Sequence, residues 1–123
     1  MVEFDPKIPI YIQIIDAVKH DIVTGKLKGG DKLPSVRELA ETFKVNPNTV
    51  QRVYQELERE GITYTQRGTG TFITEEAAKM TALKKDMAKE VITSFIESMK
   101  KLGFAQGEIL DAVQEYVKEE EQQ

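Results

Sequence analysis

Two helix-start signals separated by a short turn constrain the fold of this chain more than any other feature. Ser35 and Glu38 have the spacing of a capping box, and Asn46 can cap a helix that has Pro47 in its first turn. The residues between the two signals leave room for one short helix and a turn of about three residues. We therefore predict a helix that follows Ser35, a tight turn, and a longer helix that runs to Gly61.

The patterns on either side of this helix pair complete a domain. Apolar residues recur every four positions from Ile10 to Ile22 and predict a first helix. The segment ITYTQRGTGTFIT, which follows the pair, has β-forming residues on both sides of a tip with two glycines, and it predicts a two-stranded hairpin. Two short helices joined by a tight turn and followed by a hairpin make a winged helix-turn-helix, which we assign to residues 1–74.

From residue 75 the sequence has a long helical period, and a shorter amphipathic helix follows Gly103. The expected fold class is thus mainly α with a small β-hairpin, a winged helix-turn-helix followed by a two-helix dimerisation appendage over residues 75–123. The apolar stripe of the appendage either packs on its own winged domain or pairs with a second copy. We favour a second copy, because two helices alone leave an apolar face uncovered and folds of this type usually act as two-fold dimers. The residues expected at the dimer interface are Met80, Leu83, Met87, Val91, Phe95, Met99, Leu102, Ile109 and Val113.

Charge is distributed unevenly along the 123 residues, whose net charge is -4. Residues 1–74 hold ten Lys or Arg and ten Asp or Glu, whereas residues 75–123 hold seven and eleven. All four arginines lie between residues 37 and 67, and arginine is the side chain best suited to bidentate contacts with phosphate or guanine. The acidity of the whole chain is therefore no argument against a nucleic-acid partner for the winged domain.

The second helix of a helix-turn-helix inserts its N-terminal residues into the major groove of DNA. In this sequence the polar side chains at those positions are Asn48, Thr49, Gln51 and Arg52. Asn and Gln form paired hydrogen bonds with adenine, Arg does so with guanine, and Thr holds a phosphate or touches a thymine methyl group. We therefore predict that these four side chains contact DNA.

Two further segments are candidate contacts to the DNA backbone. Ser35 and Arg37 start the preceding helix, which crosses the phosphates in this geometry. The tip of the wing combines one arginine with glycines that let the main chain approach a phosphate or the minor groove. The wing residues are Arg67, Gly68, Thr69 and Gly70.

Other functions are weaker interpretations of the same residues. An exposed polar helix face is usually only solvated, and a winged helix can also serve as a protein interaction module, which is the alternative that stays open. The single histidine, His20, is expected on the surface rather than in a metal site. With no cysteine and no convergent carboxylate pair, the chain offers no set of acid, base and nucleophile, so we expect no enzyme, no cofactor and no metal. No stretch approaches the roughly 20 apolar residues of a membrane span, and we expect a cytoplasmic protein.

The stretch from Pro9 to Ile73 closely resembles the GntR family of bacterial transcription regulators. The resemblance is carried together by PIYIQI, the run GKLKGGDKLPSVREL, NPNTV and RGTGTFI. The short two-helix tail is similar to that of the YtrA-like subfamily, whose members dimerise through these helices and lack the large ligand-binding domain of other branches. The resemblance implies a homodimeric repressor that binds a palindromic double-stranded DNA operator, and it identifies no small-molecule effector.

The resemblance also implies which residues contact DNA. They are Ser35, Arg37, Asn48, Thr49, Gln51, Arg52, Arg67, Gly68 and Gly70. One position departs from the family pattern. Where some branches have a base-contacting arginine near the start of the recognition helix, this chain has Pro47, so the base preference of those branches does not carry over.

Overall fold

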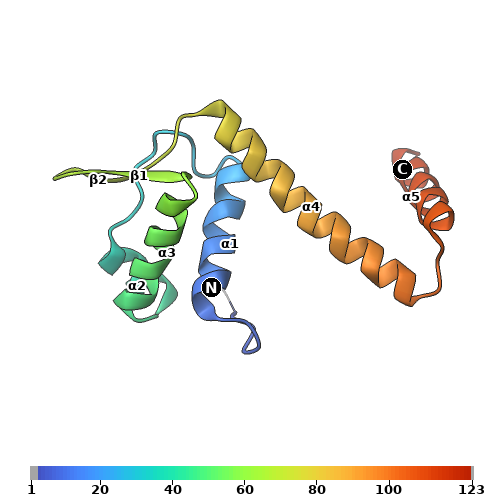
Figure 1. Cartoon of the computed structure of the whole chain (residues 1–123), viewed down its shortest axis with the longest axis horizontal. Helices are drawn as coiled ribbons and strands as arrows, with labels where there is room; N and C mark the ends of the chain where they lie inside the picture. The colour runs from blue at the N-terminus through green and yellow to red at the C-terminus, as the bar shows by residue number, and fades with distance from the viewer. Residues whose placement is uncertain (1–2, 123) are drawn as a thin grey trace. The chain divides into compact units, whose positions relative to one another are not determined.

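The computed structural model describes residues 3–122, which are mainly helical with one small β-hairpin (Figure 1). In chain order the elements are α1 (Ile10–Val23), α2 (Val36–Phe43), α3 (Pro47–Arg59), β1 (Thr63–Gln66), β2 (Gly70–Ile73), α4 (Ala77–Lys101) and α5 (Gln106–Glu121). The expected fold class, a winged helix-turn-helix followed by two helices, is confirmed. Within the described residues no helix has both the length and the apolar character needed to cross a bilayer.

The chain divides into two compact units, Met1–Lys84 and Lys85–Gln123, and the division falls inside α4. The first turns of α4 therefore belong to the N-terminal unit, which continues past residue 74. Leu83 lies in these turns and is buried. The first turns of α4 thus belong to one unit and the rest of α4 to the other.

Helix α3 is the centre of the N-terminal unit, because it packs against α1, α2 and β1. Its Val50, Val53 and Leu57 follow the spacing of one helix face, and all three are fully buried. Helix α1 contributes Ile14 and strand β2 contributes Ile73, which are also fully buried. Each such burial stabilises the fold by about 1.5–3 kcal/mol, so the apolar face of α3 fixes its position. Figure 1 shows the three helices side by side, with the hairpin at the C-terminal end of α3.

Both helix-start signals of the sequence are present as hydrogen bonds. The amide of Glu38 donates to Ser35 Oγ at 3.1 Å, and the amide of Ser35 donates to Glu38 Oε1 at 2.9 Å. The amide of Asn48 donates to Asn46 Oδ1 at 2.8 Å, and Pro47 is the first residue of α3. The predicted capping box, the short turn and the second cap are therefore confirmed.

Strands β1 and β2 pair in antiparallel orientation, with Gln66 opposite Gly70 next to the tip. The predicted hairpin is thus confirmed. A feature that the sequence did not predict lies at its side, where Lys32 forms an isolated antiparallel bridge with Phe72. The glycine-rich loop before α2 therefore joins the sheet, and the hairpin is supported along β2 as well as by its own pairing.

The C-terminal unit contains the rest of α4 and all of α5, and it leaves many apolar side chains open to solvent. Val91 and Leu102 are 70% and 73% exposed, and Tyr116 is 62% exposed. A group of large apolar side chains exposed together is uncommon in a monomeric protein and usually marks a surface that another molecule covers.

Two of the residues expected at the dimer interface are already buried within the single chain, and the interface itself stays a prediction. Leu83 and Ile109 are 7% and 6% exposed. Leu83 lies in the first turns of α4, which belong to the winged unit, and Ile109 lies in the first turn of α5. The other expected interface residues are half-buried (Met80, Met87 and Met99) or exposed (Val91, Phe95, Leu102 and Val113).

Candidate nucleic-acid interface

The side of α3 opposite the core is polar and open to solvent. Asn48, Gln51 and Arg52 are exposed on it, and Thr49 is half-buried. We call these four residues the α3 polar face. All four lie in the first half of a helix that begins at Pro47. The structure thus brings the four expected contact residues together at one helix N-terminus, where the helix dipole adds positive potential.

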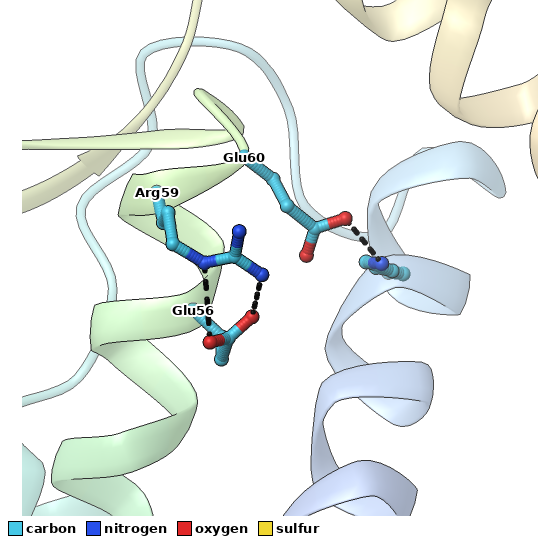
Figure 2. Close-up of polar contacts among 4 residues, drawn as sticks. Glu56, Arg59 and Glu60 are labelled. Atoms are coloured by element: carbon cyan, nitrogen blue, oxygen red, sulfur yellow. Dashed lines mark hydrogen bonds and ion pairs between the residues drawn. The ribbon is translucent and has the colours of Figure 1, made fainter.

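Acidic side chains follow in the second half of α3 and at its C-cap, and two of them have basic partners (Figure 2). The Arg59 guanidinium donates to the two carboxylate oxygens of Glu56 at 2.6 and 3.2 Å. Lys19 Nζ, on α1, lies 3.1 Å from Glu60 Oε1. The hydrogen bond from Arg59 holds the pKa of the Glu56 carboxyl below its ordinary value. The negative charge of Glu56, the first acidic residue after the α3 polar face, is therefore partly compensated.

Arg52 has a partner on a different helix. Its guanidinium carbon lies 3.7 Å from the centroid of the Tyr11 ring, which belongs to α1. A guanidinium stacks favourably on an aromatic face, and this leaves its N–H groups free, since they lie in the guanidinium plane. Arg52 is thus drawn to the side of the α3 polar face that borders α1. Tyr11 belongs to the PIYIQI motif, but its contact with Arg52 could not be predicted from the sequence, because it depends on how α1 packs against α3.

Ser35 and Arg37 both lie at the start of α2, as expected. The Ser35 oxygen accepts the Glu38 amide, so the hydroxyl hydrogen stays available for a phosphate oxygen. The bonds from Ser35 hold the pKa of the Glu38 carboxyl below its ordinary value. Arg37 is exposed and forms no ion pair with any carboxylate in residues 3–122. Both side chains therefore retain the donors that a phosphate contact needs.

Tyr54 connects α3 to the segment before α2. Its side chain is buried, and its hydroxyl donates to the Pro34 carbonyl at 2.6 Å. Burial, and then the charge of Glu38, raises the pKa of Tyr54 to about 12. Because Pro34 immediately precedes the cap of α2, this hydrogen bond aligns Ser35 and Arg37 with α3.

The wing tip is a separate patch at the end of the hairpin, which Figure 1 shows at the C-terminal end of α3. Arg67, Gly68 and Thr69 are exposed there, and Gly70 is half-buried. Gly68 and Gly70 have φ values of +79° and +134°, which L side chains rarely adopt. A Cβ on Gly70 would also lie 2.7 Å from Lys32 Cε. The glycines are thus required by the shape of the tip.

Two lysines that the sequence analysis did not single out lie beside these patches. Lys44 ends α2 with a φ of 57°, and it is the one non-glycine residue with positive φ in the described part of the chain. A groove between α2 and α3 is lined by residues that include Arg37, Glu41 and Lys44. Lys32 lies against Gly70. The contact of Lys32 depends on tertiary structure, whereas Lys44 is a local helix end without the glycine that usually marks one.

His20 is exposed on α1, where we expected it on the surface. Across residues 3–122, no three His, Asp or Glu side chains gather as the ligands of a metal ion would. The candidate functional surface therefore consists of the start of α2, the α3 polar face and the wing tip.

The model of a known family, described as bacterial regulatory proteins of the gntR family, matches residues 10–73. The chain belongs to the GntR family. Among its GntR relatives, the uncharacterized HTH-type transcriptional regulator YhcF of Bacillus subtilis is 46% identical over 93% of this chain and 94% of YhcF. The HTH-type transcriptional repressor YtrA of the same organism is 49% identical over 75% of this chain and 77% of YtrA. This chain is therefore a YtrA-like GntR regulator.

Two solved structures agree with this assignment. A GntR family transcriptional regulator from Listeria monocytogenes is 46% identical and superposes with a TM-score of 0.83 over 91% of this chain and 98% of that one. AraR(DBD), solved in complex with operator ORR3, is 30% identical and has a TM-score of 0.53 over 60% of this chain and 87% of that one. The GntR domain of this chain is thus that of a DNA-binding transcription regulator.

Proposed function

We propose that this GntR-family chain is a transcriptional repressor, without enzymatic activity, that binds a palindromic operator as a homodimer in the cytoplasm. The observation that carries the proposal is the α3 polar face, whose side chains lie in the first half of one helix with three of the four, Asn48, Gln51 and Arg52, exposed. In a helix-turn-helix this end of the second helix enters the major groove. The similarity to the repressor YtrA supports repression rather than activation.

The side chains of the α3 polar face divide by chemistry. Asn48 and Gln51 are suited to paired hydrogen bonds with adenine, and Arg52 is suited to guanine or to a phosphate. Thr49 is half-buried, so its short hydroxyl and methyl group suit a nearby phosphate or a thymine methyl. Asn48 and Gln51 would supply the base preference of the regulator.

The start of α2 and the wing tip would hold the DNA backbone. Ser35 and Arg37 offer a hydroxyl and an unpaired guanidinium to the strand that α2 crosses. At the wing tip, a flexible arginine lies next to glycines whose main chain can approach the DNA closely. The proposed wing contacts are Arg67, Gly68, Thr69 and Gly70.

The homodimer follows from the exposed apolar side chains of the C-terminal unit. The large apolar residues exposed in this unit are Val91, Ile92, Phe95, Leu102, Leu110, Val113, Tyr116 and Val117. A second copy is the occupant that matches a palindromic operator, since two-fold related half-sites require a two-fold related protein. We propose this set, together with the half-buried Met87 and Met99, as the dimer interface in place of Leu83 and Ile109.

Selection from a library of genomic fragments, followed by fluorescence anisotropy on the selected fragment and on a random duplex of equal length, tests the proposal. We expect a preference for the selected fragment and a steep loss of affinity with salt, with a log-log slope of about -0.9 per neutralised phosphate. Footprinting is expected to show two protected half-sites one helical turn apart, about 34 Å. Equal affinity for both duplexes would contradict operator binding and would favour a protein interaction module.

A further inference from the structure

Helices α1 and α3 run side by side in the same direction, and side-chain contacts join them at two levels (Figure 1). At the first level the Arg52 guanidinium lies over the Tyr11 ring at 3.7 Å. At the second level Lys19 Nζ lies 3.1 Å from Glu60 Oε1. Tyr11 to Lys19 and Arg52 to Glu60 are both steps of eight residues, so the two helices keep their register between the levels.

The stack at the first level orients Arg52 without using its hydrogen-bond donors. The aromatic ring contacts the face of the guanidinium, whereas the five N–H groups point outward in its plane. Tyr11 is half-buried, and Arg52 is exposed. The ring is thus anchored in the unit while the donors of Arg52 remain accessible to a ligand.

The carboxylate best placed to capture Arg52 is occupied. Glu56 lies four residues after Arg52 on the same helix, which is a spacing that favours ion pairs. Glu56 is bonded instead to Arg59, through two hydrogen bonds of 2.6 and 3.2 Å (Figure 2). Arg52 forms no ion pair within residues 3–122. Its positive charge is therefore available to an anion.

We propose that Tyr11 is a positioning residue for DNA binding, which holds the Arg52 guanidinium toward a phosphate of the DNA backbone. The inference rests on the proposed DNA-binding function and adds a residue outside the helix-turn-helix to it. A phosphate is the partner rather than a base, because the stack draws Arg52 toward α1. A guanidinium edge with parallel N–H groups also matches phosphate oxygens in a bidentate contact.

Two substitutions at Tyr11 distinguish the contribution of the aromatic ring to DNA binding from that of the hydroxyl. Tyr11→Leu removes the stack, and we expect it to weaken binding by about two- to fivefold per half-site, the range of an exposed cation–π contact. The loss is expected on the selected fragment and on the random duplex alike, since a phosphate contact does not depend on sequence. Tyr11→Phe keeps the aromatic face and is expected to bind like the wild type.

The matched control is Lys19→Ala, which breaks the second contact between α1 and α3 and leaves Arg52 untouched. We expect this variant to keep wild-type affinity. A loss equal to that of Tyr11→Leu would show that general docking of α1, and not the orientation of Arg52, supports DNA binding, and it would overturn the inference.

A double-mutant cycle with Arg52→Ala gives the decisive result. If Tyr11 acts through Arg52, Tyr11→Leu causes no further loss in the Arg52→Ala background, and Arg52→Ala lowers the salt slope by about 0.9. Equal losses from Tyr11→Leu in both backgrounds would overturn the inference. So would a loss in Tyr11→Phe as large as in Tyr11→Leu, since the hydroxyl would then make the contact.

Thermal unfolding of each full-length variant shows whether it is folded, so that DNA affinities are compared between folded proteins. Tyr11→Met provides a second non-aromatic variant if Tyr11→Leu does not fold. Failure of the proposed function has a different signature, because the wild type would then show no preference for any genomic fragment. The cycle on the random duplex would still report whether Tyr11 and Arg52 are coupled.

Discussion

The Tyr54 hydroxyl in α3 donates to the Pro34 carbonyl, 2.6 Å away, and so connects α3 to the segment just before α2. We expect Tyr54→Phe to lower the free energy of unfolding by about 0.5–1.5 kcal/mol at neutral pH, because the Pro34 carbonyl loses a donor. Urea unfolding monitored by circular dichroism measures this loss. Tyr64→Phe is the matched control, since Tyr64 lies on the wing with 37% of its surface exposed, and it should leave stability unchanged. Equal values for the two variants would contradict the role of the hydrogen bond.

The same tyrosine predicts a pH dependence. Burial raises the pKa of Tyr54 from 10.0 to about 12 in the folded chain, so the neutral hydroxyl is favoured by folding. Its contribution to stability is fully present below pH 10, and it is lost as the pH rises from 10 through 12, because the unfolded chain releases this proton first. The stability of the wild type should therefore fall more steeply than that of Tyr54→Phe over this interval. Parallel curves in alkaline urea titrations would contradict the raised pKa.

Truncation of Arg37 and truncation of Gln51 should have different effects on DNA binding. Arg37→Ala is expected to weaken binding to every duplex and to reduce the salt slope by about 0.9, since one phosphate contact is lost. Gln51→Ala is expected to relax the base preference at one position by about 1–3 kcal/mol. Anisotropy titrations on operator variants measure both effects, and Lys26→Ala controls for the loss of one positive charge elsewhere. Identical profiles for Arg37→Ala and Gln51→Ala would be inconsistent with these roles.

The proposed dimer interface is tested by a charge at a position that the single chain leaves uncovered. Val91 is 70% exposed, so Val91→Glu should not disturb the isolated chain, but it places an unpaired charge inside the interface. We expect this variant to sediment as a monomer. Thr93→Glu, also at an exposed position of α4 and a little more than half a turn away, should remain dimeric. A wild-type mass for Val91→Glu would place the interface elsewhere.

The two wing glycines should differ in their tolerance of alanine. Gly68→Ala forces an alanine into the left-handed region, at a cost of about 1–2 kcal/mol. Gly70, with a φ of +134°, lies where almost only glycine occurs, so we expect Gly70→Ala to destabilise the chain more. The nearby Lys32 contact involves the end of a flexible side chain, so Lys32→Ala should not rescue Gly70→Ala. Thermal unfolding ranks the three variants, and rescue by Lys32→Ala would show that crowding is the cause.

The helices and the hairpin were predictable because their signals are local. The capping box joins Ser35 to Glu38 within one turn, and Asn46 caps a helix whose next residue is Pro47. Such devices need only residues that are neighbours in the sequence. Two of the three parts of the candidate interface followed from them, since these parts lie at the starts of α2 and α3, and the wing tip followed from the hairpin.

The contacts that the sequence missed join residues far apart in the chain. The stack of Tyr11 on Arg52 and the bridge between Lys32 and Phe72 exist only once the unit has folded. The apolar stripe of α4 shows a related limit. Periodicity identifies the apolar face of a helix but not the surface that covers it, which is why Leu83 was assigned to the dimer interface although the chain buries it.

At Lys44 the backbone conformation favours glycine, whereas the side chain supplies a positive charge. Its φ of 57° is that of a position at which helices usually end in glycine, and an L side chain there costs about 1 kcal/mol. Lys44→Gly should therefore raise the melting temperature while it removes a positive charge next to Arg37. Because Arg37, a proposed phosphate contact, lies in the same groove, we expect the more heat-resistant variant to bind DNA less tightly. Thermal stability alone would then not rank variants of this chain by function.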